Sequence, residues 1–176
     1  MLEKEFSEDI NEELLLPEFE ENGFSVAIKR EDLVFPFASG NKWRKLKYNL
    51  EAFKSSSFDG ILSFGGAYSN HLAATAALTA LEQIPSIGIV RGDELEHKPL
   101  NPTLAQCLAN GMLLVFVSRN EYALKEQGQT VQNLLKSQTL YVLPEGGTNA
   151  LAVKGCTEIL SPADIGYDVV GCAVGT

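Results

Sequence analysis

Three cationic side chains, Lys42, Arg44 and Lys45, crowd the first turn of a helix that the sequence predicts after Gly40. Unsatisfied N–H groups give a helix N-terminus a partial positive charge, so cations there are disfavoured by the helix and by one another. These influences, together with burial, lower the pKa of a lysine, and a neutral lysine amine is a nucleophile toward carbonyl groups. Lys42 lies four residues before Leu46, on the inward stripe of the helix, and is therefore the candidate nucleophile. The open alternative is that all three cations are solvated surface residues.

A second candidate stretch is LSFGGAYSNHLAATAA, residues 62–77, in which a glycine turn precedes an alanine-rich helix. Ser69 or Asn70 is placed to cap this helix, and the free N–H groups of a helix N-terminus bind carboxylates and phosphates. Ser69, Asn70 and His71 add side-chain donors at the same point. The alternative is a well-capped helix with no ligand.

The stretch PEGGTNALAVKG, residues 144–155, repeats this arrangement with Gly146, Gly147 and a Thr148 or Asn149 cap. An ordinary strand-to-helix turn explains it equally well. The last residues, AVGT, end a predicted strand at Gly175 and Thr176, where a phosphate-binding loop can begin.

Short apolar segments alternate with helical segments along the chain, which is typical of the α/β class, with parallel sheets covered by helices on both faces. Ligands in such sheets bind beyond the carboxyl ends of the strands. The expected strands are residues 24–32, 60–64, 85–90, 112–118, 139–147 and 168–176, and the expected helices are residues 41–53, 69–83, 101–111, 121–136 and 149–160. The last strand has no covering helix after it, so we expect a fragment of a longer protein.

Composition narrows the classes of function. The chain has 176 residues and a net charge of −9, which disfavours nucleic acid and anionic membranes as partners. No segment reaches the ~20 apolar residues of a membrane span, and the acidic first residues do not resemble a signal peptide. The three cysteines are isolated and no metal-binding spacing occurs, so we expect a cytoplasmic protein without a metal site.

The motifs KREDL-PF-SGNKWRKLKYNL, FGGAYSNHLAATAA, PEGGTN and GCAVGT occur in this order. Together they closely resemble the 1-aminocyclopropane-1-carboxylate deaminase/D-cysteine desulfhydrase family of fold type II, pyridoxal-phosphate-dependent enzymes. The resemblance implies a three-layer, two-domain α/β fold whose C-terminal half is missing here. Residues 45–143 would form the smaller parallel-sheet domain, and residues 1–44 and 144–176 would be parts of the larger, cofactor-binding one.

The same resemblance assigns roles to individual residues. Lys42 would hold pyridoxal 5'-phosphate covalently and act as the catalytic base, and Asn70 would bond the phenolic oxygen of the cofactor. Ser69, Asn70 and His71 would receive the substrate carboxylate. Gly175 and Thr176 would begin the loop that binds the cofactor phosphate.

The activity implied is deamination of a small amino acid with β-elimination, with D-cysteine as the first choice of substrate. The alternative within the family is ring opening of 1-aminocyclopropane-1-carboxylate, and His71 stands where the ring-opening deaminases have glutamine. A non-catalytic remnant is the alternative of another class. The resemblance also implies a homodimer.

Overall fold

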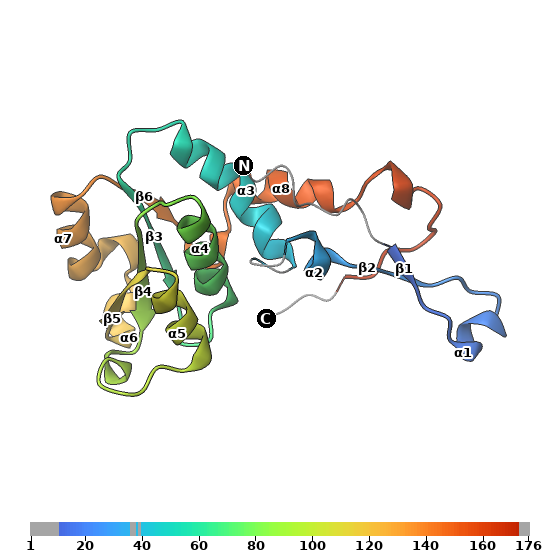
Figure 1. Ribbon diagram of the computed structural model, residues 1–176, viewed down its shortest axis with the longest axis horizontal. Coiled ribbons are helices and arrows are strands. Elements are labelled where there is room, and N and C mark those ends of the chain that lie inside the picture. The colour runs from blue at the N-terminus through green and yellow to red at the C-terminus, as the bar shows by residue number, and fades with distance from the viewer. Residues whose placement is uncertain (1–10, 36–37, 39, 173–176) are drawn as a thin grey trace.

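The computed structural model describes residues 11–35, 38 and 40–172. Its centre is a sheet of four parallel strands in the order β5-β4-β3-β6, labelled in Figure 1. These strands are β3 (Gly60–Gly65), β4 (Ser86–Arg91), β5 (Leu113–Val117) and β6 (Leu140–Leu143). Leu62 of β3 is in register with Ile87 of β4 and with Val142 of β6. The expected α/β class with a parallel sheet is confirmed.

Helices cover both faces of this sheet, because alternate strand residues point to opposite sides. Leu62, Phe64, Ile87 and Ile89 pack with Tyr122 and other residues of the segment after β5, whereas Ile61 and Val90 face the opposite layer. One layer contains α3 (Asn41–Lys54), α4 (Asn70–Leu81) and α5 (Pro102–Ala109), and the other contains α6 (Arg119–Ala123) and α7 (Gln129–Ser137).

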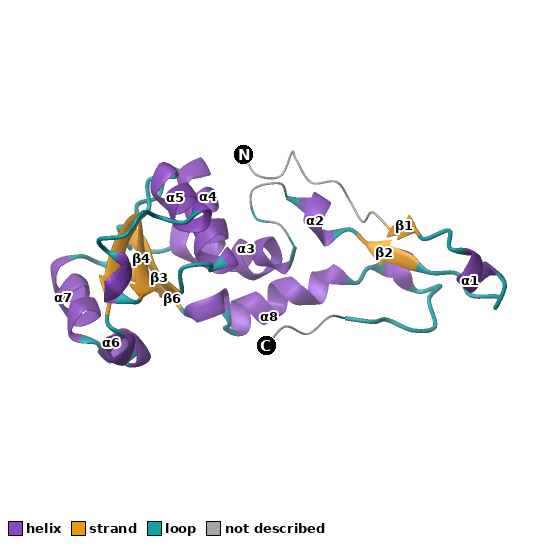
Figure 2. Ribbon diagram, turned by 90° about the horizontal axis from the view of Figure 1, so that it is seen from below, coloured by secondary structure: helices purple, strands orange, loops and turns teal. Residues whose placement is uncertain are grey.

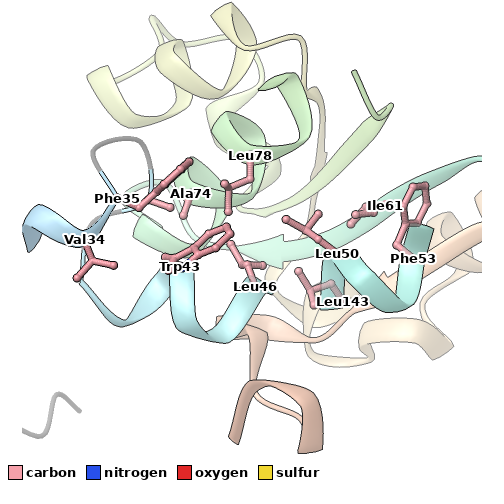
Figure 3. Close-up of a cluster of buried hydrophobic side chains, with 11 residues drawn as sticks. Val34, Phe35, Trp43, Leu46, Leu50, Phe53, Ile61, Ala74, Leu78 and Leu143 are labelled. Carbon is pink, nitrogen blue, oxygen red and sulfur yellow. The ribbon is translucent and has the colours of Figure 1, made fainter. Parts of the chain in front are cut away.

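Helix α3 is attached to the sheet by its apolar stripe, which Figure 3 shows in close-up. Trp43, Leu46, Leu50 and Phe53 recur at helical spacing and are buried against residues of β3, α4 and β6. The Trp43 ring stacks on Phe35 with their centroids 4.9 Å apart. This packing holds the N-terminal turn of α3, and with it Lys42, in place beside the sheet.

A second, smaller part of the molecule lies beyond the pair formed by α3 and α8 (Ala150–Cys156), as Figures 1 and 2 show. It contains the antiparallel strands β1 (Asn11–Glu13) and β2 (Ala27–Lys29) and the short helices α1 (Pro17–Glu20) and α2 (Glu31–Val34). The strand expected over residues 24–32 is thus only three residues long. Short 3₁₀ turns complete the described chain at Asp93–Leu95, Lys125–Gln127, Glu145–Gly147, Thr157–Ile159 and Pro162–Asp164.

The single helix expected over residues 121–136 is wrong, because the chain breaks there into α6, a 3₁₀ turn and α7. Gly128 is extended, with φ −64° and ψ 143°, and it caps α7. The Glu121 carboxylate accepts a hydrogen bond of 2.7 Å from the backbone N–H of Thr130. This bond takes the place of the backbone hydrogen bonds that a continuous helix would form here, and α7 packs against the sheet as a separate helix.

The strand expected from Asp168 is not formed over residues 168–172, and residues 173–176 lie outside the described part. Val169 is 84% exposed, because no strand within the described residues pairs with it and no helix covers it. An apolar pattern alone does not make a strand without a neighbour. The division into domains at residues 45 and 143 stays a prediction.

Candidate active site

The candidate residues gather at the carboxyl edge of the sheet, where the strand order reverses. From β3 the chain adds β4 and then β5 on one side, but β6 returns to the other side of β3. The loops that follow β3 and β6 therefore diverge at a topological switch point, which is where open α/β sheets bind ligands. The glycine turns at residues 65–66 and 146–147 stand at these two strand ends.

Lys42 lies in the first turn of α3 and faces this edge. It is half-buried, and its pKa is lowered by burial first and by the neighbouring charge of Lys45 second, while Cys156 acts weakly in the opposite sense. The direction expected from the charge pattern is therefore confirmed. Within the described chain, Lys42 has no hydrogen-bond or ion-pair partner, so its amine is uncommitted.

The other two cations of this turn have partners, which separates them from Lys42. Arg44 donates two hydrogen bonds, of 3.1 and 3.0 Å, to the Glu31 carboxylate. Lys45 donates to the carbonyl oxygen of Gly146 and to Thr148 Oγ1, each at 3.2 Å. Arg44 thus ties α3 to α2, and Lys45 ties α3 to the glycine turn after β6.

The N-terminus of α4 lies at the end of β3. Ser69 caps it by accepting a 3.2 Å hydrogen bond from the backbone N–H of Leu72. A Cβ at Gly65 would lie 2.5 Å from Ser69 Oγ, so only glycine permits this cap geometry. Within the described chain, the first-turn N–H groups of Asn70 and His71 have no hydrogen-bond acceptor. These two N–H groups can therefore donate hydrogen bonds to a bound anion. The Asn70 side chain is exposed at the same point.

The His71 ring points inward and is almost fully buried. Its Nε2 lies 2.9 Å from Ser63 Oγ, and Ser63 donates its own hydrogen to the Leu143 carbonyl oxygen at 3.0 Å. Ser63 Oγ must therefore accept from Nε2–H, which leaves Nδ1 as a bare acceptor. Nδ1 has no partner among the described residues. Burial, and then the charges of Lys42 and Lys45, lower the pKa of His71 to about 4, so the ring is neutral at pH 7.

Gly147 closes the space beside this ring. Its φ is +67°, and a Cβ there would lie 2.9 Å from His71 Cε1 and 3.3 Å from Nδ1. A side chain at this position would strain the backbone and push the ring away. Gly147 therefore brings together the turn after β6 and the beginning of α4.

Sequence reasoning missed a buried amide pair that joins α3 to α8. Asn49 is 1% exposed, and its Oδ1 accepts hydrogen bonds from Asn149 Nδ2 at 2.7 Å and from Tyr141 Oη at 2.9 Å. Asn149 Oδ1 in turn caps α8 by accepting from the Ala152 N–H at 2.9 Å. The available signal was a polar residue on the apolar stripe three positions after Leu46, because a buried amide requires partners.

Gly155 was missed as well. A Cβ at this position would lie 1.8 Å from the carbonyl oxygen of Arg44, so α8 packs with its backbone directly against α3. The first turn of α3, which carries Lys42, therefore packs against α8, and only glycine fits at position 155 of this contact.

Lys42 and His71 both lie at this edge of the sheet, and the charge of Lys42 helps to lower the pKa of His71. The structure places Ser69 and Asn70 at the same edge of the sheet. Gly175 and Thr176 lie outside the described residues, so the phosphate-binding loop stays a prediction. In the described part of the chain no group of three or more metal-ligating side chains occurs, and no helix is long and apolar enough to cross a membrane.

Comparison with known proteins identifies relatives along most of the chain. A Thermotoga maritima protein that bears the name of a 1-aminocyclopropane-1-carboxylate deaminase is 34% identical over 89% of this chain and 52% of its own length. The bifunctional D-cysteine desulfhydrase/1-aminocyclopropane-1-carboxylate deaminase of Arabidopsis thaliana is 30% identical over 88% of this chain and 43% of its own. A D-cysteine desulfhydrase of Salmonella paratyphi B is 30% identical over 77% of this chain and 43% of its own length.

A solved structure of a homologue of 1-aminocyclopropane-1-carboxylate deaminase shares the fold, with a TM-score of 0.73 at 24% identity over 93% of this chain and 50% of that one. No protein-family model matches the chain. The resemblance predicted from the motifs is confirmed by these relatives. The chain spans about half the length of the curated relatives it matches.

Proposed function

We propose that this chain carries the lysine-bearing half of a pyridoxal-phosphate-dependent enzyme that deaminates a small amino acid with β-elimination. The observation that carries the proposal is the state of Lys42, which lies half-buried at the topological switch point of the sheet. Its pKa is lowered, and it has no hydrogen-bond or ion-pair partner within the described chain. Proteins named for this chemistry are similar to the chain over most of its length.

The residues around Lys42 fit the cofactor. Lys42 would hold pyridoxal 5'-phosphate through its side-chain nitrogen, because a neutral amine combines with an aldehyde. Asn70 offers an exposed amide at the same edge of the sheet, and Gly147 approaches the His71 ring closely with no side chain of its own. When bound, the cofactor supplies an electron sink for the charge that develops at the substrate α-carbon.

The protein's own groups supply binding and proton transfer. The first-turn N–H groups at Asn70 and His71, with the positive end of α4, would bind the substrate carboxylate. Burial and then the charge of Lys45 lower the pKa of Lys42 Nζ, which favours its neutral form, so this amine would act as the base that takes a proton from the α-carbon. The His71 ring cannot donate to that carboxylate from its bare Nδ1, so its side chain would position the α4 terminus through Ser63.

D-cysteine is the proposed substrate, and with one water it gives pyruvate, hydrogen sulfide and ammonia. The D-cysteine desulfhydrase among the relatives supports this choice, together with His71 in place of glutamine. The alternative is hydrolytic ring opening of 1-aminocyclopropane-1-carboxylate to 2-oxobutanoate and ammonia, which the bifunctional relative supports. A homodimer and a cytoplasmic location, expected from the resemblance and the cysteine usage, belong to the same proposal.

The test is to add pyridoxal phosphate, remove the excess, record the absorption spectrum, reduce with borohydride and map the modified peptide. A single adduct on Lys42 is expected, absent from Lys42→Arg and retained in Lys54→Arg, a control at the far end of the same helix. Adducts scattered over surface lysines would contradict the cofactor assignment. Release of sulfide from D-cysteine and of 2-oxobutanoate from the cyclopropane substrate then distinguishes the two activities, and neither product from a loaded chain would favour the non-catalytic remnant.

A further inference from the structure

A hollow lies at the same edge of the sheet, beside the loop that follows β3. It has a volume of about 490 Å³ and lies at the carboxyl ends of β3, β4 and β5. Its walls are the loop residues 66–69, Arg91 at the end of β4, Glu94 and Leu95 of the next turn, and Arg119 after β5. Hollows of this size accommodate small organic molecules.

Arg91 is the feature of this hollow that calls for a ligand. It is exposed, and within the described chain no carboxylate lies within ion-pair distance of its guanidinium. Its Cζ lies 5.7 Å from the centroid of the Tyr122 ring, and a Cβ added at Gly66 would lie 3.5 Å from its Nη2. The nearby Glu145 carboxylate is already bound by Lys125 at 2.7 Å and by Tyr122 Oη at 2.5 Å.

Arg119 provides a second guanidinium whose present partner is exchangeable. It contacts Glu94 at 2.7 Å, with side-chain exposures of 70% and 42% for the two residues. Exposed ion pairs of this kind contribute little free energy, so an incoming anion can compete for Arg119. Two guanidinium groups against one carboxylate leave the hollow locally positive on a chain whose net charge is −9.

We propose that this hollow, which we name the Arg91 pocket, binds a small anion that carries a carboxylate or phosphate group. Arg91 would bind the oxyanion in a bidentate manner, because the planar guanidinium matches carboxylate and phosphate oxygens. Tyr68, which is 76% exposed, and Leu95 offer apolar surface for the remainder of an organic anion. Ser69 belongs both to this pocket and to the cap of α4, so a bound anion would touch the loop that leads to the candidate active site.

The test uses the 176-residue chain without cofactor, so it does not depend on the proposed function. Inorganic phosphate and succinate are titrated separately by calorimetry at low ionic strength, and the two titrations distinguish a phosphate ligand from a carboxylate ligand. Saturable binding of at least one probe is expected. Arg91→Gln is expected to weaken it about tenfold or more, the loss of a charge-assisted bidentate contact. Arg91→Lys keeps the positive charge but loses the bidentate hydrogen-bonding geometry of the guanidinium, and it is expected to give an intermediate affinity.

Two further variants complete the design. Glu94→Gln frees Arg119 and is expected to tighten binding, whereas Lys136→Gln removes one positive charge from exposed α7 and is expected to leave the affinity unchanged. Circular dichroism melting checks that each variant remains folded. The proposal is overturned if neither probe saturates, or if Arg91→Gln and Lys136→Gln bind as the unmodified chain does.

Discussion

The contact between α3 and α8 predicts that Gly155→Ala destabilises the protein strongly. The added Cβ would lie 1.8 Å from the Arg44 carbonyl oxygen, whereas real Cβ contacts essentially never fall below 3.0 Å. The helices must therefore separate by about 1.2 Å at this point. Both atoms belong to backbone or are fixed to it, so no side-chain rotation relieves the contact. Overpacking of this kind costs about 1–3 kcal/mol, and we expect a loss at the upper end of that range.

The sign of the effect makes this prediction decisive. Alanine in place of glycine inside an unconstrained helix stabilises a protein by about 0.5–1 kcal/mol. Urea unfolding, followed by far-UV circular dichroism, measures the free energy of unfolding for Gly155→Ala and for Val153→Ala, an exposed position of the same helix. We expect a loss of about 3 kcal/mol for the first and less than about 0.5 kcal/mol for the second. A neutral or stabilising Gly155→Ala would refute the close packing of α8 on α3.

Three further predictions concern the surroundings of the candidate site. Gly147→Ala is expected to lower the melting temperature, because it combines a φ of +67° with a Cβ 2.9 Å from His71, and differential scanning fluorimetry measures this. The free energy of unfolding is expected to fall as the pH decreases from about 6.5 to 4, by up to about 3 kcal/mol from His71 alone. In this range the unfolded state binds a proton at His71 and the buried ring of the folded state does not. Urea unfolding as a function of pH, compared with His71→Gln, measures this contribution. Asn149→Ala is expected to cost about 1–3 kcal/mol in urea unfolding, because it removes the cap of α8 and a buried partner of Asn49.

Matched variants separate the causes in these experiments. Gly146→Ala has the same backbone strain, with φ +68°, but its Cβ would meet only Thr148 Oγ1 at 3.8 Å. An equal loss for Gly146→Ala and Gly147→Ala would show that the contact with His71 contributes nothing. A His71→Gln chain with an unchanged pH dependence would contradict the neutral, buried ring. Asn149→Asp keeps the cap and loses the donated hydrogen bond, so it should fall between Asn149→Ala and the unmodified chain.

The sheet, most helices and the environment of Lys42 were predictable because their signals are local. Apolar runs at strand length predict β3 and β4, and the spacing of Trp43, Leu46 and Leu50 predicts the buried face of α3. The pKa of Lys42 is lowered by burial first and by the charge of Lys45 second, and both causes follow from its position on the inward stripe and in the first turn of α3, which the sequence displays directly.

The supporting contacts were not predictable, because they join residues far apart in sequence. Asn49 and Asn149 are 100 positions apart, and only the packing of α8 on α3 makes their side chains partners. The requirement for glycine at position 155 arises from the same packing of α8 on α3. Residues 168–172 carry the apolar pattern of a strand but lack a neighbour within the described chain, so propensity alone predicted the wrong structure there.

The strand order also has a consequence for synthesis on the ribosome. The edge of β3 that pairs with β6 cannot be covered until β6 has been made, and about 75 residues separate the end of β3 from the start of β6. At about 5–20 residues per second, this edge stays open for roughly 4–15 s, during which β4 and then β5 are made and added on the other side of β3. An open edge of a buried apolar strand invites pairing with other chains. During the interval before β6 emerges, the nascent chain therefore exposes a pairing edge of β3 that the finished sheet covers.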